Sequence, residues 1–206
     1  MLHLDALTAA QREALAVIAP VASAESFYLA GGCGLALHLG HRLSVDLDMF
    51  RREPLADPLV LARRLKEQRT RFTTTSRAEG TLHGRCRGVP ISFMEYRYPF
   101  VRRVVAAGLP CRIASVEDIG CMKLAAIVDR GAKKDFVDLH FILRRVSLSK
   151  LLQDYRKKFA VEDTTAVRIA LAYFDDAEPH PMPAMIADVN WDELKASIRE
   201  SVRALR

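Results

Sequence analysis

The sequence predicts an α/β protein, with a mixed sheet and helices over residues 1–146 and a helical region over residues 147–206. Short apolar runs typical of strands are confined to the part before residue 115, and amphipathic helical patterns fall between them. Beyond residue 147 only helical patterns remain. The strands therefore belong to the first region, and the second contributes helices alone.

The first half of the chain is expected to alternate helices and strands. Apolar residues at helical spacing run from about residue 7 to 19 and stop before Pro20. A glycine-rich stretch between residues 71 and 96 indicates two or three antiparallel strands with tight turns. The other predicted elements are strands at 27–30, 44–50 and 111–114 and helices at 34–39 and 58–69.

The second half begins with a clear helix start. Ser115 stands in capping position, the helix is expected to continue to Arg130, and Gly131 ends it. A second helix is predicted over residues 133–146. Three more follow at about 149–159, 163–174 and 191–205.

Composition limits the classes of protein to be considered. Half of the 206 residues are apolar, enough for a core without disulfides, and four cysteines show no CxxC pair. No apolar run reaches bilayer length, so we expect a soluble, cytoplasmic protein with no membrane partner. The net charge of +6, carried largely by paired arginines, fits a phosphate-bearing partner such as RNA, or solvated helix faces.

Asp46 and Asp48 are the candidate metal-binding residues of the first half. They alternate with apolar Leu47 and Met49, so a strand would project both carboxylates from one face. Two carboxylates this close favour a cation between them, and Mg²⁺, or Mn²⁺ in its place, takes such oxygen ligands together with a triphosphate. The alternative is a solvated strand with no metal. Preceding glycines would let backbone N–H groups approach phosphate at a helix N-terminus.

Two stretches together resemble a known family. The first runs from Phe27 to Leu37 and from Gly40 to Phe50, and contains Gly31-Gly32 and the acidic pair. The second contains Glu117–Ile119, Met122–Ile127 and Arg130–Leu139. Both resemble the motifs of AbiEii-type nucleotidyltransferases, which belong to the polymerase-β-like nucleotidyltransferase superfamily.

The resemblance implies the polymerase-β-like nucleotidyltransferase fold with a helical C-terminal part. It implies transfer of a nucleotidyl group from an NTP to an acceptor, which in some members is a tRNA end. Several members are toxins paired with an antitoxin protein. One alternative is a binding module on the same fold that has no turnover. Another is transfer to a small molecule such as an aminoglycoside.

Site residues are carried over from the resemblance by position. Asp46 and Asp48 are the implied metal ligands, and Asp135 is a further active-site acid that serves as base or simply caps its helix. Lys123 is the implied contact to the triphosphate, because a cation there neutralises charge on the leaving group. The alternative is a solvated lysine on a helix surface. The implied nucleotide-binding residues are Gly31, Gly32, Cys33, Arg42, Ser44, Lys123, Arg130 and Lys134.

Other readings of these residues stay open. Arg42 binds phosphate or pins its own loop. Lys123, Arg130 and Lys134 form one helical stripe only if the helix continues through Gly131.

The sequence departs from the family pattern at two positions. Many polymerase-β-like enzymes use a third carboxylate on a neighbouring strand, and the expected position holds Ser92, while Glu95 has the opposite parity. Cys33 stands where relatives carry serine or threonine, and a thiol is a poorer donor to phosphate than a hydroxyl.

Overall fold

The computed structural model describes residues 2–106 and 108–205, which fold into two compact units. Unit 1 comprises Met1–Pro99 and Arg103–Ala114, and unit 2 comprises Phe100–Arg102 and Ser115–Arg206. Unit 1 contains the sheet and unit 2 is helical, so the predicted α/β class is confirmed. Among the described residues, every helix is too short or too polar to cross a bilayer.

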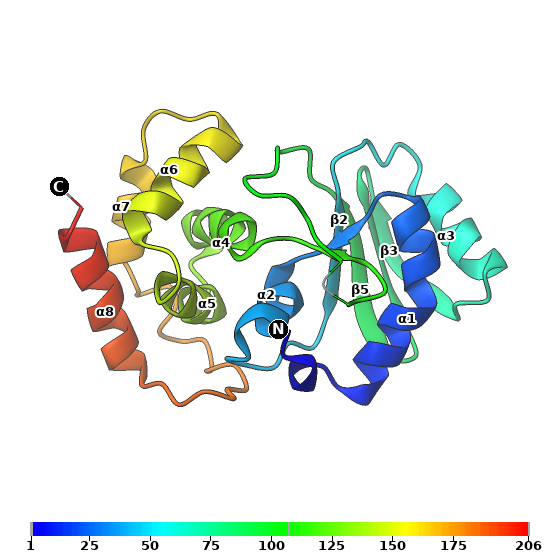
Figure 1. Ribbon diagram of the computed structural model, residues 1–206, viewed down its shortest axis with the longest axis horizontal. Helices are drawn as coiled ribbons and strands as arrows, with labels where there is room; N and C mark the ends of the chain where they lie inside the picture. The colour runs from blue at the N-terminus through cyan, green and yellow to red at the C-terminus, as the bar shows by residue number, and fades with distance from the viewer. Residues whose placement is uncertain (1, 107, 206) are drawn as a thin grey trace. The chain divides into compact units, whose positions relative to one another are not determined.

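Unit 1 is built on one mixed sheet of six strands in the order β3-β4-β5-β2-β1-β6 (Figure 1). The β3–β4, β4–β5 and β1–β2 pairs are antiparallel, whereas β2–β5 and β1–β6 are parallel. The strands are β1 (Tyr28–Leu29), β2 (Leu47–Arg51), β3 (Phe72–Ala78), β4 (Thr81–Cys86), β5 (Val89–Glu95) and β6 (Arg112–Ile113).

One face of the central strands forms the core of unit 1. Leu47 and Met49 of β2 and Ile91 and Phe93 of β5 are at most 1% exposed, and they cluster with α1 (Ala9–Ala24) and α3 (Pro58–Glu67). Figure 1 shows these two helices side by side against the sheet. Because side chains alternate along a strand, the residues between these four, Asp48 among them, face the other side.

Strand β2, beside which Asp46 lies and which contains Asp48, is shorter than expected. The prediction of a strand from residue 44 is wrong at its start, because β2 begins at Leu47 and residues 43–46 lie outside it. Val45 is 77% exposed and does not join the core. The alternation holds from Asp46 onward, since the two aspartates are half-buried and Leu47 is fully buried.

Two helices extend past their expected limits. Helix α1 was expected to end before Pro20 but continues to Ala24 with the proline inside. Proline removes one helical hydrogen bond, and burial of Val21 and Ala22 in the core offsets that loss. Helix α2 (Gly31–Leu39) begins at the paired glycines, three residues earlier than predicted.

Unit 2 consists of five helices among the residues described. Ser115 accepts a hydrogen bond from Asp118 N–H at the start of α4, and Gly131 at φ 52° ends that helix, as predicted. The helices are α4 (Val116–Arg130), α5 (Lys133–Leu143), α6 (Leu148–Phe159), α7 (Thr165–Ala172) and α8 (Trp191–Arg203).

The division between the units differs from the boundary predicted at residue 146. Helices α4 and α5 group with the C-terminal helices, because α4 packs against α5, α6 and α7. Buried Asp118 also ties the segment Phe100–Arg102 to unit 2. Its carboxylate accepts the backbone N–H groups of Val101 and Arg102 and pairs with Lys158 Nζ at 2.9 Å.

Candidate active site

Asp46 and Asp48 flank the first residue of β2. Leu47 between them is fully buried, and both aspartates are half-buried. Ser44 Oγ donates a hydrogen bond to Asp46 Oδ1 at 3.0 Å, which orients that carboxylate. Asp48 is joined to the start of α2 through its backbone, since the Ala30 N–H donates to Asp48 O at 3.0 Å.

The Asp48 carboxylate lies against the first residue of α2. A Cβ atom on Gly31 would fall 2.3 Å from Asp48 Oδ2, closer than any real contact, and Gly31 has φ +60°. Both facts require glycine at this position. The glycine therefore brings a carboxylate and the N-terminal turn of a helix into direct contact.

Gly32 allows a second close approach. A Cβ atom there would lie 2.5 Å from Arg42 Nη2 and 2.9 Å from Ser44 Oγ. Arg42 is 4% exposed, and its Nη1 donates to Leu43 O at 2.8 Å. These contacts support the reading in which Arg42 pins its loop, and they place its guanidinium at the first turn of α2.

Cys33 is buried in the core of unit 1. Its exposure is 0%, and burial, reinforced by the charges of Asp46 and Asp48, raises the pKa of the thiol far above its ordinary value. A neutral, buried thiol has no access to a ligand. A contact from Cys33 to a nucleotide would therefore use its backbone N–H, which lies in the first turn of α2 where helical N–H groups lack intrahelical acceptors.

The acidic pair fits a hard divalent cation. Mg²⁺ is commonly held by one or two carboxylates, with water and substrate phosphates filling its other positions. Asp46 and Asp48 supply those carboxylates next to a helix N-terminus suited to phosphate. Within residues 2–106 and 108–205, His, Cys, Asp and Glu side chains form no three-residue metal group.

Ser92 occupies the place of the missing third acid. It pairs with Asp48 across the parallel β2–β5 ladder, so both side chains leave the same face of the sheet. Glu95 pairs with Arg51 instead, and its Oε2 accepts the Leu55 N–H at 2.8 Å. Glu95 therefore serves the fold of unit 1 on the other side of the sheet.

A second charged cluster lies in unit 2, where α4 meets α5. Lys123 Nζ is 2.8 Å from Asp135 Oδ1 and 2.6 Å from Asp138 Oδ2. Arg130 Nε is 2.9 Å from Asp135 Oδ2. Both aspartates are 0% exposed and Lys123 is 6% exposed, so the lysine is a buried ion-pair partner and not a solvated side chain.

The electrostatics of this cluster favour the charged forms. Burial opposes ionisation of Asp135, but Lys123 and Arg130 outweigh it and hold the pKa of the carboxyl below its ordinary value. Burial likewise opposes the Lys123 ammonium, yet Asp138 and Asp135 hold its pKa above the ordinary value. A carboxylate with a lowered pKa and both oxygens engaged is a weak base.

The structure decides between the alternatives left open for Asp135 and for the basic stripe. Asp135 does not cap α5, because Ala132 is the capping residue and no side chain completes that cap. Helix α4 ends at Gly131, so the stripe of three basic residues is interrupted. Lys134 is exposed on the first turn of α5 and lies outside the Lys123–Asp135 contacts of the described chain.

Comparison with known proteins identifies the family. A family model described as "Nucleotidyl transferase AbiEii toxin, Type IV TA system" matches residues 13–110 and 87–204. The chain belongs to the AbiEii nucleotidyl transferase family. It is therefore a transferase enzyme by family.

Relatives and solved structures agree with that assignment. An uncharacterized protein of Aquifex aeolicus strain VF5 is 34% identical over 199 residues, which cover 94% of each chain. MenT4, a nucleotidyltransferase toxin of Mycobacterium tuberculosis H37Rv, matches with a TM-score of 0.58 at 16% identity, over 97% of this chain and 87% of that one. An antigenic nucleotidyltransferase-like protein of Paracoccidioides brasiliensis matches with a TM-score of 0.56 at 14% identity, over 91% and 92%.

In this AbiEii nucleotidyl transferase the candidate residues form one cluster in each unit. Unit 1 brings together the acidic pair, the two glycines, Arg42 and Ser44, and unit 2 brings together Lys123, Arg130 and Asp135. That both clusters face one nucleotide stays a prediction.

Two groups near the candidate residues were given no site role from the sequence. Asp138 lies three residues after Asp135, a spacing that puts both on one helical face. His83 contacts Ser92 across β4–β5, with Nδ1 2.9 Å from Oγ. The two-residue Arg87-Gly88 turn, with φ +52° and +81°, fixes that register and was the signal that could have revealed the pair.

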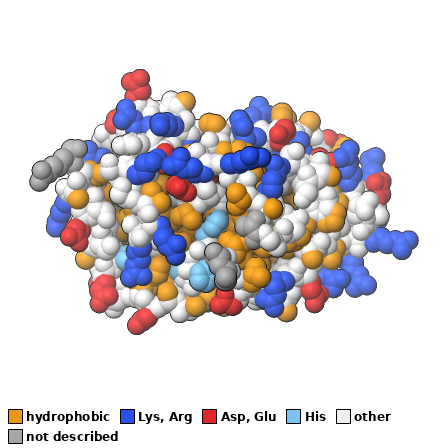
Figure 2. Space-filling model, in the orientation of Figure 1, with side chains coloured by type: hydrophobic (Ala, Val, Ile, Leu, Met, Phe, Trp, Pro, Cys, Tyr) orange, Lys and Arg blue, Asp and Glu red, His pale blue; other side chains and the backbone are white. Residues whose placement is uncertain are grey.

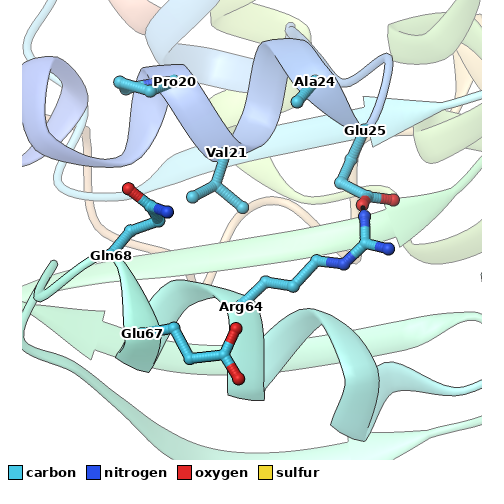
Figure 3. Close-up of a pocket in the computed structure, with 7 residues that line it drawn as sticks. All are labelled: Pro20, Val21, Ala24, Glu25, Arg64, Glu67 and Gln68. Atoms are coloured by element: carbon cyan, nitrogen blue, oxygen red, sulfur yellow. Dashed lines mark ion pairs between the residues drawn. The ribbon is translucent and has the colours of Figure 1, made fainter.

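A pocket of about 280 Å³ lies elsewhere in unit 1, between α1 and α3. Figure 3 shows Val21 pointing from α1 into the gap and Arg64 of α3 reaching to Glu25, with which it forms an ion pair. These helices cover the core face of the sheet, whereas Asp48 projects from the other face. The pocket is therefore separate from the acidic pair.

Proposed function

We propose that the protein transfers a nucleotidyl group from an NTP to an acceptor hydroxyl, using a divalent cation held by Asp46 and Asp48. The observation that carries the proposal is the close contact between Asp48 Oδ2 and Gly31 at the start of α2. It sets a metal-binding carboxylate beside backbone N–H groups that suit the phosphates of the same nucleotide.

The reaction is an in-line displacement at the α-phosphorus. The acceptor oxygen forms a bond to phosphorus, the bond to the β-phosphate oxygen breaks, and pyrophosphate leaves. The cation, when bound, would stabilise charge on the attacking and leaving oxygens. Ser44 orients Asp46, and buried Arg42 adds positive charge at the first turn of α2.

Lys123 and Arg130 are the proposed partners of the leaving pyrophosphate. Asp135 holds both cations at the junction of α4 and α5, and Asp138 holds the lysine. Because its oxygens are engaged and its pKa is lowered, Asp135 is proposed to position these cations and not to accept the acceptor's proton. Lys134 stays a predicted contact to the nucleotide, from its exposed position on the first turn of α5.

The proposed acceptor is an RNA such as tRNA, and the proposed role is that of a toxin held in check by an antitoxin protein. Four exposed arginines lie on or beside strands β3 and β4, and exposed positive charge suits a phosphate backbone. Figure 2 shows basic side chains spread over the face it draws, with acidic ones among them. The four arginines are Arg71, Arg77, Arg85 and Arg87.

A binding module that holds nucleotide without turnover is the second candidate, because Ser92 replaces the third acid opposite Asp48. Incubation with Mg²⁺, each of the four α-labelled NTPs and total RNA separates the two. Label on RNA supports the transferase. Nucleotide binding without transfer to RNA or to small-molecule acceptors supports the binding module.

A further inference from the structure

A row of polar side chains crosses the sheet of unit 1 on the face opposite its core face. Asp48 of β2 pairs with Ser92 of β5, Ser92 pairs with His83 of β4, and His83 pairs with Ser76 of β3. Residues paired across a ladder share one face, and neighbouring strands lie about 4.8 Å apart. The imidazole thus belongs to a strand about 10 Å from Asp48, with one serine between them.

His83 is held within this row. Its Nδ1 lies 2.9 Å from Ser92 Oγ, and the ring is half-buried, as is Ser92. If Nδ1–H donates to Ser92 Oγ, the lone pair of the other ring nitrogen, Nε2, is available to a ligand. A serine in the place of a carboxylate therefore positions a neutral base.

The other candidate bases are engaged by partners or buried. Glu95 accepts the Leu55 N–H, pairs with Arg97 and has a lowered pKa because of these contacts. His38 Nε2 lies 2.8 Å from Ala114 O, and His41 is 1% exposed. Asp135 is engaged in unit 2 by its two cations.

We propose that His83 Nε2 is the general base that takes the proton from the acceptor hydroxyl, with Ser92 as its positioning residue. The acceptor O–H bond breaks as the bond from oxygen to the α-phosphorus forms, and pyrophosphate leaves with the electrons of the broken phosphorus–oxygen bond. Neutral imidazole becomes imidazolium and returns the proton to water. This inference rests on the proposed transfer reaction and adds the group that replaces the third acid.

Substitutions at His83 separate a base from a structural contact. Asparagine places its amide nitrogen where Nδ1 stands, so His83→Asn can keep the contact with Ser92 but lacks Nε2. We expect His83→Asn and His83→Ala each to lower kcat by about 100-fold or more, as loss of a general base does. Thr81→Ala, two residues before His83 on the same face of β4, is the matched control and should retain transfer.

Chemical rescue supplies a readout that a structural role would not give. Imidazole added to His83→Ala should restore transfer at least about tenfold, and rescue by substituted imidazoles should increase with their basicity. The same additions should leave Asp46→Asn/Asp48→Asn inactive. Ser92→Ala should lose about tenfold in kcat, and Ser92→Thr should recover most of it.

Nucleotide binding separates failure of this inference from failure of the proposed function. His83→Asn should bind NTP with Mg²⁺ as the unmodified protein does, and its thermal unfolding should be unchanged. Retained transfer in His83→Asn, or absence of imidazole rescue in a folded, nucleotide-binding His83→Ala, would overturn the role of His83 alone. Absence of transfer by the unmodified protein with every acceptor would overturn the proposed function and this inference with it.

Discussion

Asp48 Oδ2 stands where a side chain on Gly31 would begin, with 2.3 Å between the oxygen and the ideal Cβ position. Gly31→Ala should therefore displace the carboxylate, abolish transfer and destabilise unit 1 by about 1–2 kcal/mol through its left-handed backbone alone. Gly88→Ala is the matched control, since Gly88 has φ +81° but open space around it. Denaturant unfolding should show the backbone strain in both variants and a larger loss of stability in Gly31→Ala, where the Cβ atom also displaces the Asp48 carboxylate. Transfer assays should show loss of activity only in Gly31→Ala.

The acidic pair should cost stability when no cation is bound. Replacing both residues, in Asp46→Asn/Asp48→Asn, removes repulsion between close carboxylates and should leave the metal-free protein equally stable or more so. Mg²⁺ should stabilise the unmodified protein by about 2.7 kcal/mol at 100 times its Kd and should not stabilise the variant. Thermal unfolding with and without Mg²⁺ measures this, with exposed Glu79→Gln as control. A Mg²⁺ shift that survives in the double variant would contradict the metal site.

Ser92→Asp would place a third carboxylate directly opposite Asp48. The variant should be less stable than the neutral Ser92→Asn without metal, because like charges face each other across the ladder. It should bind Mn²⁺ about tenfold or more tightly than the unmodified protein, since a carboxylate ligand is added. Calorimetric titration with Mn²⁺ compares the three proteins. Equal Mn²⁺ affinity in Ser92→Asp and Ser92→Asn would show that this position does not face the metal.

Asp135 should carry a large share of the stability of unit 2. Asp135→Asn removes the charge that pairs with Arg130 and with buried Lys123, and breaking a buried ion pair costs about 3 kcal/mol. Asp129→Asn, at an exposed position on α4, the helix that carries Lys123, is the control. Denaturant unfolding should separate the two variants.

The pH dependence of that stability follows from the lowered pKa of Asp135. A carboxyl whose pKa is lower in the folded state stabilises the protein fully above its unfolded pKa and loses that contribution as pH falls through the folded value. The stability of the unmodified protein should therefore decline between about pH 5 and pH 2 more steeply than that of Asp135→Asn. Parallel curves for the two proteins would mean that Asp135 is not held as an anion.

Local patterns in the sequence predicted much of unit 1. The alternation of Asp46, Leu47 and Asp48 identified the strand and its polar face because side-chain direction in a strand has period two. Pro20 misled the reading of α1, since burial of the next turn outweighed one lost hydrogen bond. Apolar Val45 led to a predicted strand that starts too early, because an apolar residue just before a strand need not face the core.

Features that depend on packing between elements could not be read from the chain alone. Whether Lys123 is solvated or paired depends on how α5 lies against α4, and that contact brought Asp138 into the cluster. The grouping of α4 with the C-terminal helices depends on which helical faces meet. The His83–Ser92 pair was within reach, because a two-residue turn fixes the register of the strands on either side.

Asp46 and Asp48 are proposed to support transfer of a nucleotidyl group. This role is tested by comparing NTP labelled at the α-phosphate with NTP labelled at the γ-phosphate, each incubated with Mg²⁺, total RNA and either the unmodified protein or Asp46→Asn/Asp48→Asn. We expect the unmodified protein to transfer the α-label alone and to release the γ-label in pyrophosphate, and the double variant to transfer neither. Transfer of the γ-label to the acceptor, or α-label transfer that persists in the double variant, would contradict it.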